Sequence, residues 1–453
     1  MQNQQEYVLR TVEERGIRFV QLWFTDVLGT PKAFSITPAE LENALREGMT
    51  FDGSAIDGFS RVQESDVLAR PDPTTFHILP WHGHGGTDPD DRAPVARVVC
   101  DIVNLDGSPF AGCPRHVLRR ALDRARAAGF SFYAAPEIEY FYFDGASTGG
   151  GQEPRALDSG SYFELTAADP ASELRQRTVL MLEEMGIPVE HAQHEDAPSQ
   201  HEIDLRYTDA LTMADTVMTV RQVVKELARH VGVHASFMPK PLGGVQGSGM
   251  HTHVSLFQDG ANAFAGPDRP SGLSETGEGF VAGLLRHAAE LTAVTNQWVN
   301  SYKRLVSGYE APVHISWARN NRSALVRVPV IKPHRSESAR IEYRAPDSAC
   351  NPYLTFAVLL TAGLAGVTGG YELPPEAEWN LFDASPSELV ATGIRPLPSS
   401  LHEALVEMES SELVAEALGE HVFEWFLRNK HEEWSTYKAH VSQFELARYL
   451  PSL

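Results

Sequence analysis

Four segments of the sequence alternate charged and apolar side chains, and this pattern constrains the fold more than any other feature. The segments are PEIEYFYF (136–143), HEIDLRY (201–207), MHTHVSLF (250–257) and ARIEYRAPD (339–347). Successive side chains of a β-strand point to opposite faces, so residues two apart share a face. The polar faces carry Glu137 and Glu139; Glu202, Asp204 and Arg206; His251, His253 and Ser255; and Arg340, Glu342 and Arg344. The residues between them are mostly apolar, which predicts strands with one core face and one charged face.

Each segment alone could be a strand with one ordinary solvated face. Together, however, their polar faces hold several Glu, two His and three Arg, and no Lys. Carboxylates that converge in this way repel one another, and cations relieve the repulsion. Several carboxylates with a single histidine nitrogen form an oxygen-rich ligand set, which suits Mg²⁺ or Mn²⁺ rather than zinc.

A group of arginines follows in the sequence. Five of them lie within forty-one residues: Arg304, Arg322, Arg327, Arg340 and Arg344. Each alone could form a surface ion pair. As a cluster they suit the recognition of carboxylate and phosphate groups, which arginine binds through two parallel hydrogen bonds. Divalent cations beside such a cluster indicate phosphoryl transfer.

Composition narrows the class of protein further. The chain has 453 residues and a formal net charge of -22, which argues against nucleic acid or an anionic membrane as a partner. Three cysteines, Cys100, Cys113 and Cys350, favour a reducing cytoplasm over a disulfide framework. The N-terminus lacks the apolar core of a signal peptide. The apolar run 352–367 is interrupted by Thr and Gly, and we expect a buried helix with Asn351 as its N-cap.

Local signals predict several elements. Residues 17–24 and the turn-like VLGTPK predict a strand entering a hairpin, and TPAE (37–40) predicts a capping box that opens a helix ending at Gly48. Helices are expected over 114–129, from Asp169-Pro170 to Met185-Gly186, over 208–231 and 272–296, and in most of the last seventy residues. The segment 82–94 is expected to be a loop near the end of a first domain. STGGGQ (147–152) lacks a following GK[ST] and is interpreted as a surface loop.

Longer motifs resemble those of the bacterial type I glutamine synthetase family. They are FDGSAIDGF, PEIEYFYF, HEDAPSQHEID, FMPKP, GSGMHTHVSLF, NSYKRLVSGYEAPV, NNRSALVRVP and RIEYRAPDSACNPYL, and they cover nearly the whole chain in order. The resemblance implies an α+β fold with a β-grasp domain over residues 1–107. A catalytic domain over residues 108–453 would contain a curved antiparallel sheet flanked by helices. It also implies a dodecamer of two stacked hexameric rings, with active sites between neighbouring subunits.

The resemblance also implies roles for individual residues. Two or more divalent cations are expected, one held by Glu139, Glu195 and Glu202 and another, which bridges the phosphates of the co-substrate ATP, by Glu137, His251 and Glu342. The expected glutamate and amine site contains Arg304, Arg344, Gln246, Gly247, Tyr162, Ala55 and Asp196. Expected nucleotide contacts are Tyr207, His253, Ser255, Arg322 and Arg327, and the transferring phosphoryl group would be neutralised by Arg322, Arg327 and Arg340.

The implied reaction joins an amine to the γ-carboxylate of L-glutamate through a γ-glutamyl phosphate made from ATP. An ammonium or alkylammonium ion must lose a proton before it attacks, so an acid near the site both attracts the cation and accepts the proton. The matching candidates are Asp52, reaching in from the adjacent chain, and the flap-loop acid Glu310. A guanidino kinase, which has related chemistry, would need neither acid.

Four positions depart from the family pattern. Ala55 stands at a usual serine, Gln246 at an asparagine, Asp196 at an apolar residue and Ser199 at a glycine. The loss of a hydroxyl and the gain of an acid favour an alkylamine or polyamine acceptor, as in a γ-glutamylpolyamine synthetase. If these changes are neutral drift, the chain is a true glutamine synthetase that uses ammonia. A third alternative is a non-catalytic family member, although every matched position holds a competent residue.

Two further positions concern regulation. Phe382, in NLFD, occupies the place of the tyrosine that some family members adenylylate, and we expect no adenylylation here. Arg61 resembles an arginine that some type I members use for feedback by glutamine.

Overall fold

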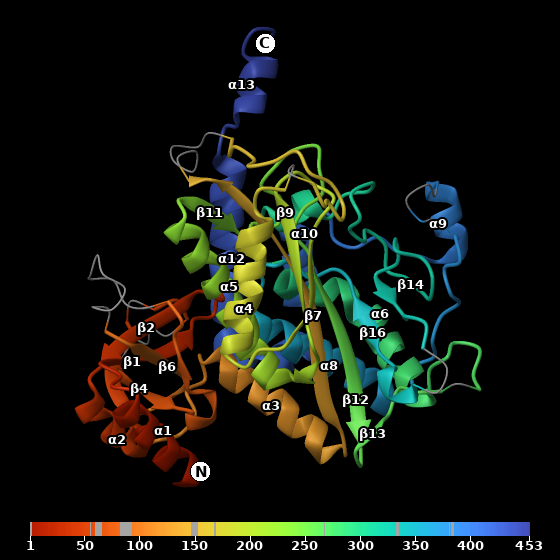
Figure 1. Cartoon of the computed structure of the whole chain (residues 1–453). Coiled ribbons are helices and arrows are strands. Elements are labelled where there is room, and N and C mark those ends of the chain that lie inside the picture. Colours follow the sequence, from red (N-terminus) through yellow and green to blue (C-terminus); the bar gives the residue numbers. More distant parts are fainter. Residues whose placement is uncertain are drawn as a thin grey trace.

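The computed structural model describes residues 2–453 except 55, 59–65, 82–92, 146–152, 167–168, 267, 332–334, 380 and 382–384. Its described strands form two sheets (Figure 1). The first has the order β2-β1-β6-β4-β3, with β5 also paired to β6, and only the β1–β6 pair is parallel. Its strands are β1 (Phe19–Thr25), β2 (Pro31–Ile36), β3 (Met49–Asp52), β4 (Asp66–Pro71), β5 (His77–Ile78) and β6 (Val95–Val103). Helices α1 (Gln2–Glu14) and α2 (Pro38–Glu47) contribute buried residues to the core of this part.

The second sheet contains all four alternating segments. Its order is β14-β15-β16-β12-β7-β9-β8, with β10 and β11 also paired to β7 and β13 to β12. Its strands are β7 (Ser131–Asp144), β8 (Val189–His194), β9 (Gln200–Leu205), β10 (Thr208–Asp209), β11 (Val233–Ser236), β12 (Met250–Gln258), β13 (Ala261–Asn262), β14 (Trp317–Ala318), β15 (Val326–Arg327) and β16 (Ile341–Tyr343). The β14–β15 pair is parallel, and the other pairs are antiparallel.

Helices provide the other side of the core beneath this second sheet. The apolar residues of the alternating segments, such as Ile138, Ile203, Val254 and Ile341, are buried in one cluster with residues of these helices. The helices are α3 (Pro114–Ala127), α4 (Ser172–Glu184), α5 (Ala210–His230), α6 (Glu275–Thr295), α7 (Ser301–Arg304), α8 (Pro352–Gly369), α9 (Pro386–Thr392), α10 (Leu401–Glu409), α11 (Glu412–Leu418), α12 (Glu420–Ala439) and α13 (Gln443–Tyr449). The α+β class is therefore confirmed, and the apolar face of the alternating strands packs against the core.

Most local predictions are confirmed, including the hairpin β1–β2 and the helices with proline starts and glycine ends. The capping box at 37–40 is wrong. The Thr37 side chain makes no cap hydrogen bond, and the Glu40 N–H instead donates to the backbone oxygen of Thr37. Proline at the first turn and Gly48, with φ 85, suffice to bound α2. The calls on 147–152, Ala55, Arg61 and Phe382, and most of the loop 82–94, lie outside the described residues.

Helix α8 is long and apolar enough to cross a membrane, but 67% of its apolar window is buried inside the protein. Its N-cap is Asn351, whose side chain accepts hydrogen bonds from the Tyr353 and Leu354 N–H groups. The prediction of a buried core helix is confirmed.

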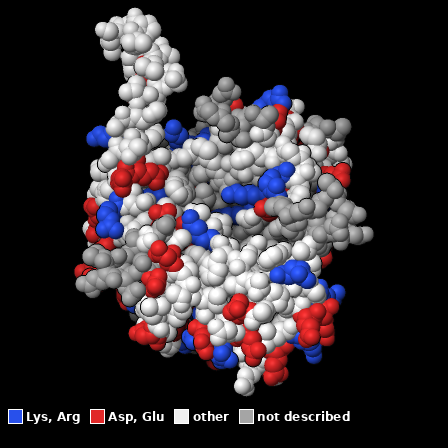
Figure 2. All heavy atoms as spheres, turned by 90° about the vertical axis from the view of Figure 1, so that its left-hand side faces the viewer, with Lys and Arg blue, Asp and Glu red and all other residues white. Residues whose placement is uncertain are grey.

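The C-terminal segment stands away from the rest of the chain. In Figures 1 and 2 helix α13 projects beyond the end of α12 as a mostly uncharged arm. Its exposed apolar residues are Val441, Phe444, Leu446, Tyr449, Leu450 and Leu453. A projecting apolar segment of this kind is unusual for a surface that meets only water.

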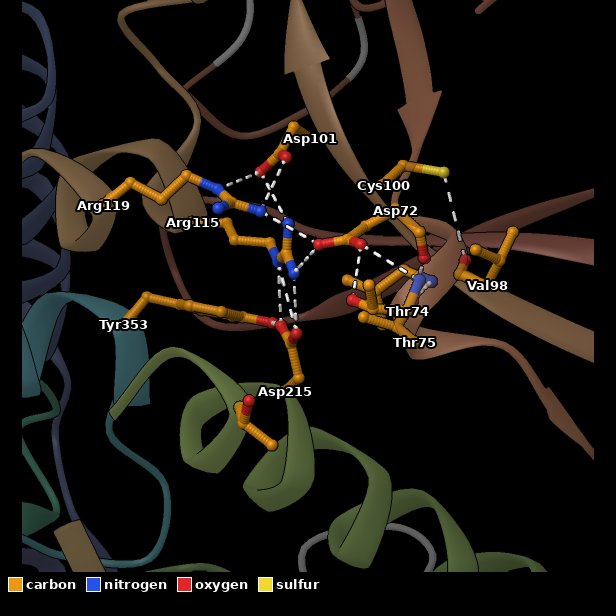
Figure 3. A network of polar contacts seen from close by, with 12 residues as sticks. Asp72, Thr74, Thr75, Val98, Cys100, Asp101, Arg115, Arg119, Asp215 and Tyr353 are labelled. Atoms are coloured by element: carbon orange, nitrogen blue, oxygen red, sulfur yellow. Dashed lines mark hydrogen bonds and ion pairs between the residues drawn. The ribbon is translucent and has the colours of Figure 1, made fainter. Parts of the chain in front are cut away.

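A buried arginine joins the N-terminal part to helices of the rest of the chain (Figure 3). Arg115, on α3, donates to Asp101 Oδ1 and Asp72 Oδ2, each at 2.8 Å, and to Asp215 Oδ2 at 2.9 Å. The Tyr353 hydroxyl donates to the other oxygen of Asp215 at 2.7 Å. Asp72 and Asp101 come from the N-terminal part, whereas Asp215 and Tyr353 belong to α5 and α8. This guanidinium is therefore one of the contacts that fix how the two parts meet, together with the Asn351 amide, which donates to the backbone oxygens of Asp26 and Val27.

Candidate active site

The strand register brings the charged faces into one row across five neighbouring strands. Glu137 on β7 lies opposite His251 on β12 and Asp204 on β9. Glu139 lies opposite Glu202 in the same β7–β9 pair. Further along, β16 and β15 extend the row, because Glu342 pairs in register with both His253 and Arg327. The convergence of carboxylates that the alternation predicts is thus present in the sheet.

The residues expected to hold the nucleotide-bridging cation lie close together. Ligand atoms of Glu137, His251 and Glu342 all lie within 4.8 Å of one another. His251 Nδ1 is 3.3 Å from Glu137 Oε2 and 3.7 Å from Glu342 Oε1, and His253 Nε2 is 2.7 Å from Glu137 Oε1. Two carboxylates and one imidazole at these separations fit Mg²⁺ or Mn²⁺.

The residues expected around the other cation are arranged less compactly. The Gln193 amide donates to Glu195 Oε1 at 2.9 Å and to Glu202 Oε1 at 2.8 Å, and so lies between the two carboxylates. Glu139 is held separately, by the Gln200 amide and the Gly249 N–H, both at 2.9 Å. Sequence reasoning missed Gln193, although its alternation with Glu195 along the chain was an available signal.

Crowding and burial raise the pKa of several carboxylates in the row. Burial, and then the nearby Glu195 charge, raises the pKa of Glu139 to about 8. Burial, followed by Glu137, raises the pKa of Asp204 to about 8, and burial raises the pKa of Glu195 to about 7. The pKa of Glu202 is well above its usual value for the same reasons, burial first and Asp204 second. Bound cations would relieve this repulsion.

At the other end of the row, the pKa values of the ionisable groups are lowered instead of raised. Burial alone would raise the pKa of Glu137, but hydrogen bonds from His251 and His253 hold it below its usual value. Burial also acts to raise the pKa of Glu342. The charges of Arg344 first and His253 second nevertheless lower this pKa to about 2. Burial and then Arg344 lower the pKa of His251 to about 4. A neutral imidazole is the form that a metal ion requires.

The arginines expected at the site differ in their bonding partners and in their exposure. Arg327 and Arg344 both form ion pairs with Glu342, and Arg340 Nε donates to His253 Nδ1 at 3.3 Å. Arg304 is 2% exposed and donates to the Ala345 backbone oxygen at 2.7 Å. Arg322, in contrast, is exposed.

Two glycines allow the backbone to approach Arg304. A Cβ at Gly249 would lie 2.5 Å from Arg304 Nη2, and a Cβ at Gly247 would lie 2.2 Å from the Pro239 oxygen. Any side chain at either position would displace the guanidinium or the backbone. Gly247 is buried, and Gln246 beside it is half-buried.

Two of the expected nucleotide contacts, Ser255 and Tyr207, lie beside Tyr133. Ser255 lies opposite Tyr133 in the β12–β7 pair. Tyr207 is 62% exposed, and its ring meets the edge of the Tyr133 ring at a centroid distance of 5.9 Å. Exposed aromatic rings of this kind can stack on a nucleobase. Tyr133 was missed by the sequence analysis because it lies outside the alternating segment.

Four described residues are expected at the acceptor site, and one of them, Asp52, lies on the other sheet. Asp52 ends β3 and is exposed on the N-terminal sheet, whereas the charged row belongs to the second sheet. Glu310 is exposed with φ 56, and its charge acts on Glu195. Tyr162 is 39% exposed and lies near Gln193 and Arg322. Asp196 is exposed, next to Glu195.

On the opposite face of β8 and β9, two histidines are buried against acids. His194 Nε2 lies 3.1 Å from Asp158 Oδ1, and Arg175 bonds His201 Nδ1 and Asp169 Oδ2 at 2.8 Å each. Each histidine directly precedes a glutamate of the charged row, so this cluster fixes the strands that carry the row. It was missed because polar residues on a core face break the alternation.

Ser199, one of the four departures, has a structural role in this cluster. Its φ is 62, in the left-handed region that glycine adopts most easily. Its hydroxyl accepts from the Leu157 N–H at 2.6 Å, and its own N–H donates to Asp158 Oδ1 at 2.6 Å. These bonds account for the serine without reference to the acceptor.

Comparisons with known proteins complete the description. The family model described as "Glutamine synthetase, catalytic domain" matches residues 111–449, and "Glutamine synthetase, beta-Grasp domain" matches residues 16–105. A curated relative from Mycobacterium tuberculosis, named glutamine synthetase, is 57% identical over 99% of this chain and 100% of its own length. A solved structure titled "GmaS/ADP complex-Conformation 1" is 31% identical, with TM-score 0.86 over 98% of this chain and 99% of its own. A glutamine synthetase from Plasmodium falciparum, 24% identical, has the same fold, with TM-score 0.88 over 98% of both chains.

Proposed function

We infer the reaction from the premise that the chain belongs to the glutamine synthetase family and is an ATP-dependent carbon–nitrogen ligase. We propose that it joins an amine to the γ-carboxylate of L-glutamate through a γ-glutamyl phosphate. The observation that carries this proposal is the row of carboxylates and imidazoles on the sheet, with arginines paired into it.

The chemistry explains why such a row is needed. A carboxylate is a poor acyl donor because its leaving group would be oxide. In the proposed reaction a γ-carboxylate oxygen attacks the γ-phosphorus of ATP and ADP leaves. The amine then attacks the carbonyl carbon, phosphate leaves, and the nitrogen loses a proton. Divalent cations held by Glu137, His251 and Glu342, and by Glu139, Glu195 and Glu202, would offset the phosphate and carboxylate charge.

The remaining residues position and neutralise the reactants. We assign Arg304 and Arg344 to glutamate and Arg322, Arg327 and Arg340 to the transferring phosphoryl group. The ion pairs of Arg327 and Arg344 with Glu342 support this assignment, because a cation bound to Glu342 would free both guanidinium groups for substrate anions.

We propose that two acids handle the proton of the acceptor. Glu310 would take it within the chain, supported by its proximity to the charged row. Asp52, on the other sheet, would act in the site of a neighbouring copy.

For the acceptor we propose an alkylamine or polyamine. Exposed Asp196, beside Glu195, supports this choice because it adds a carboxylate that could bind a second ammonium group. Ser199 has a structural explanation that does not involve the acceptor, and Ala55 lies outside the described residues. Ammonia is the second candidate, and the name of the 57% identical relatives favours it.

An amine panel tests the proposal. With L-glutamate and ATP, we expect phosphate release with putrescine or spermidine and a product of the mass of the γ-glutamyl amide. Replacing Asp196 with valine should lower kcat/KM for spermidine roughly tenfold, or about 1.4 kcal/mol, and leave turnover with ammonium unchanged. Turnover with low-millimolar ammonium but none with putrescine, spermidine or ethanolamine would refute the alkylamine acceptor, and no turnover with any amine would refute the reaction.

We further propose a dodecamer in which α13 packs on another copy of this chain. The exposed fractions of Phe444 and Leu450, 65% and 77%, support a partner of apolar character. Mass photometry should give a particle of twelve chains for the full-length protein and smaller particles for Leu450→Glu. Val406→Glu, an exposed change on α10, should leave the assembly intact. Unchanged particles of the Leu450→Glu variant would contradict the proposal.

We place the protein in the cytoplasm. Cys100, Cys113 and Cys350 are unpaired and buried, which supports a reducing compartment. Recovery of the full-length chain outside the cytoplasmic fraction of its host would contradict this.

A further inference from the structure

The expected metal ligands leave one carboxylate of the charged row without a role. Asp204 is 7% exposed on β9, between Glu137 on β7 and His191 on β8. Its Oδ2 lies 2.8 Å from His191 Nε2. Its Oδ1 is buried and has no hydrogen-bond partner among the described residues. A buried carboxylate oxygen without a partner is costly and suggests a missing ligand.

The surroundings of Asp204 contain more acid than base. Glu202 approaches it along the same strand, and Glu137, Glu190 and Glu195 are the other charges that act on it most strongly. Arg327 and Arg344 pair instead with Glu342, and Arg340 with His253, at the other end of the row. The imidazole of His191 can neutralise one oxygen of Asp204, but it leaves the other oxygen and Glu202 uncompensated.

These side chains converge as metal ligands do. One ligand atom each from His191, Glu202 and Asp204 lie within 4.8 Å of one another. We propose that they form a third cation subsite, beside the two expected cations and sharing Glu202 with one of them. The inference rests on the proposed two-cation site for that shared ligand.

The donor set indicates which cation would bind. One imidazole with two carboxylates is the same type of donor set as Glu137, His251 and Glu342, so it fits Mn²⁺ or Mg²⁺, and Mn²⁺ is the ion that accepts the imidazole more readily. The His191 side chain is 55% exposed, so a hydrated ion can reach the ligands without displacing a strand. A bound ion would also take up the unpartnered oxygen of Asp204.

Counting Mn²⁺ ions tests this subsite. Full-length protein without nucleotide is titrated with Mn²⁺, and free Mn²⁺ is measured by electron paramagnetic resonance. We expect three bound ions per chain for the wild type. His191→Gln and Asp204→Asn should bind two, or bind the third at least tenfold more weakly. His234→Gln, which changes an exposed histidine on β11 of the same sheet, is the matched control and should bind three.

The outcomes separate this inference from the proposed function. A wild type that saturates at two ions, or His191→Gln and Asp204→Asn variants that still bind three with unchanged affinity, overturns the third subsite alone. A wild type that binds none overturns the third subsite and the proposed two-cation site together. Anomalous scattering at the manganese edge gives a second readout, with a peak between His191 and Asp204 that is absent in crystals of His191→Gln.

Discussion

Replacing Arg115 with methionine is expected to lower the free energy of unfolding by about 3–5 kcal/mol, because it leaves buried charges without their partner. The Arg115 side chain is 4% exposed and faces three carboxylates, and its removal would leave Asp215, 7% exposed, without an ion pair among the described residues. Although burial opposes the charged form, these acids hold the pKa of Arg115 well above its usual value. Methionine keeps most of the volume and removes only the charge and its hydrogen bonds.

Arg119→Met provides the matched control for this prediction. Arg119 contacts the same Asp72 and Asp101, each at 3.0 Å, but its side chain is 36% exposed. The Arg119→Met change should therefore lower the free energy of unfolding by about 1 kcal/mol or less. Denaturant unfolding monitored by circular dichroism would measure both variants. Equal losses for the two variants would show that burial of Arg115 does not govern the strength of this junction.

Removing divalent cations should make the stability of the protein fall as the pH rises from 6 to 9. The pKa values of Glu139 and Asp204 are raised to about 8, and that of Glu195 to about 7. An acid with a raised pKa in the folded state binds its proton more tightly there than in the unfolded chain. Its contribution is complete below its unfolded pKa and is lost as the pH passes the folded value. We expect a loss on the order of 3 kcal/mol across this range.

Adding Mg²⁺ should reverse most of this loss, because the cations replace the protons. Melting temperatures measured at both ends of the pH range, with Mg²⁺ or with a chelator at matched ionic strength, would check this. Both the folded and the unfolded pKa of Glu342 lie below this range, so it does not contribute to the trend. The pKa of His251 is lowered from 6.5 to about 4, so it adds a small gain in stability near pH 6.5, which opposes the trend only at the lower end of the range. Metal-free protein that gains stability toward pH 9, or that responds equally to Na⁺, would contradict the prediction.

The sequence predicts the charged row because its signal is local. Glu137 and Glu139, or His251 and His253, lie two apart on single strands, and alternation alone places each pair on one face. The pattern also identifies the buried positions between them. Which strand neighbours which, and in what register, is not a local property, and the longer motifs supplied that expectation.

The residues that sequence reasoning missed have no comparable local signal. Arg115 and Asp215 are one hundred positions apart, and nothing near either residue indicates the other. Asp158 and Asp169 belong to irregular segments and face histidines that interrupt an apolar face. Asp204 and His191 did lie in alternating positions, but no motif gave them a role. At Thr37 the sequence is typical of a capping box, yet the side-chain hydrogen bond does not form. The Glu40 N–H donates to the Thr37 backbone oxygen instead.

The Arg115 junction also restricts how substrates can reach the charged row. Rotation of the N-terminal part away from α3 would have to separate this guanidinium from Asp72 and Asp101 while Asp215 stays with it. Breaking these buried ion pairs costs several kcal/mol, so the rotated form is expected in only a small minority of molecules. Conformational change in the charged region is expected instead in shorter segments, such as the one around Glu310, whose φ of 56 is in the left-handed region and costs a non-glycine residue strain.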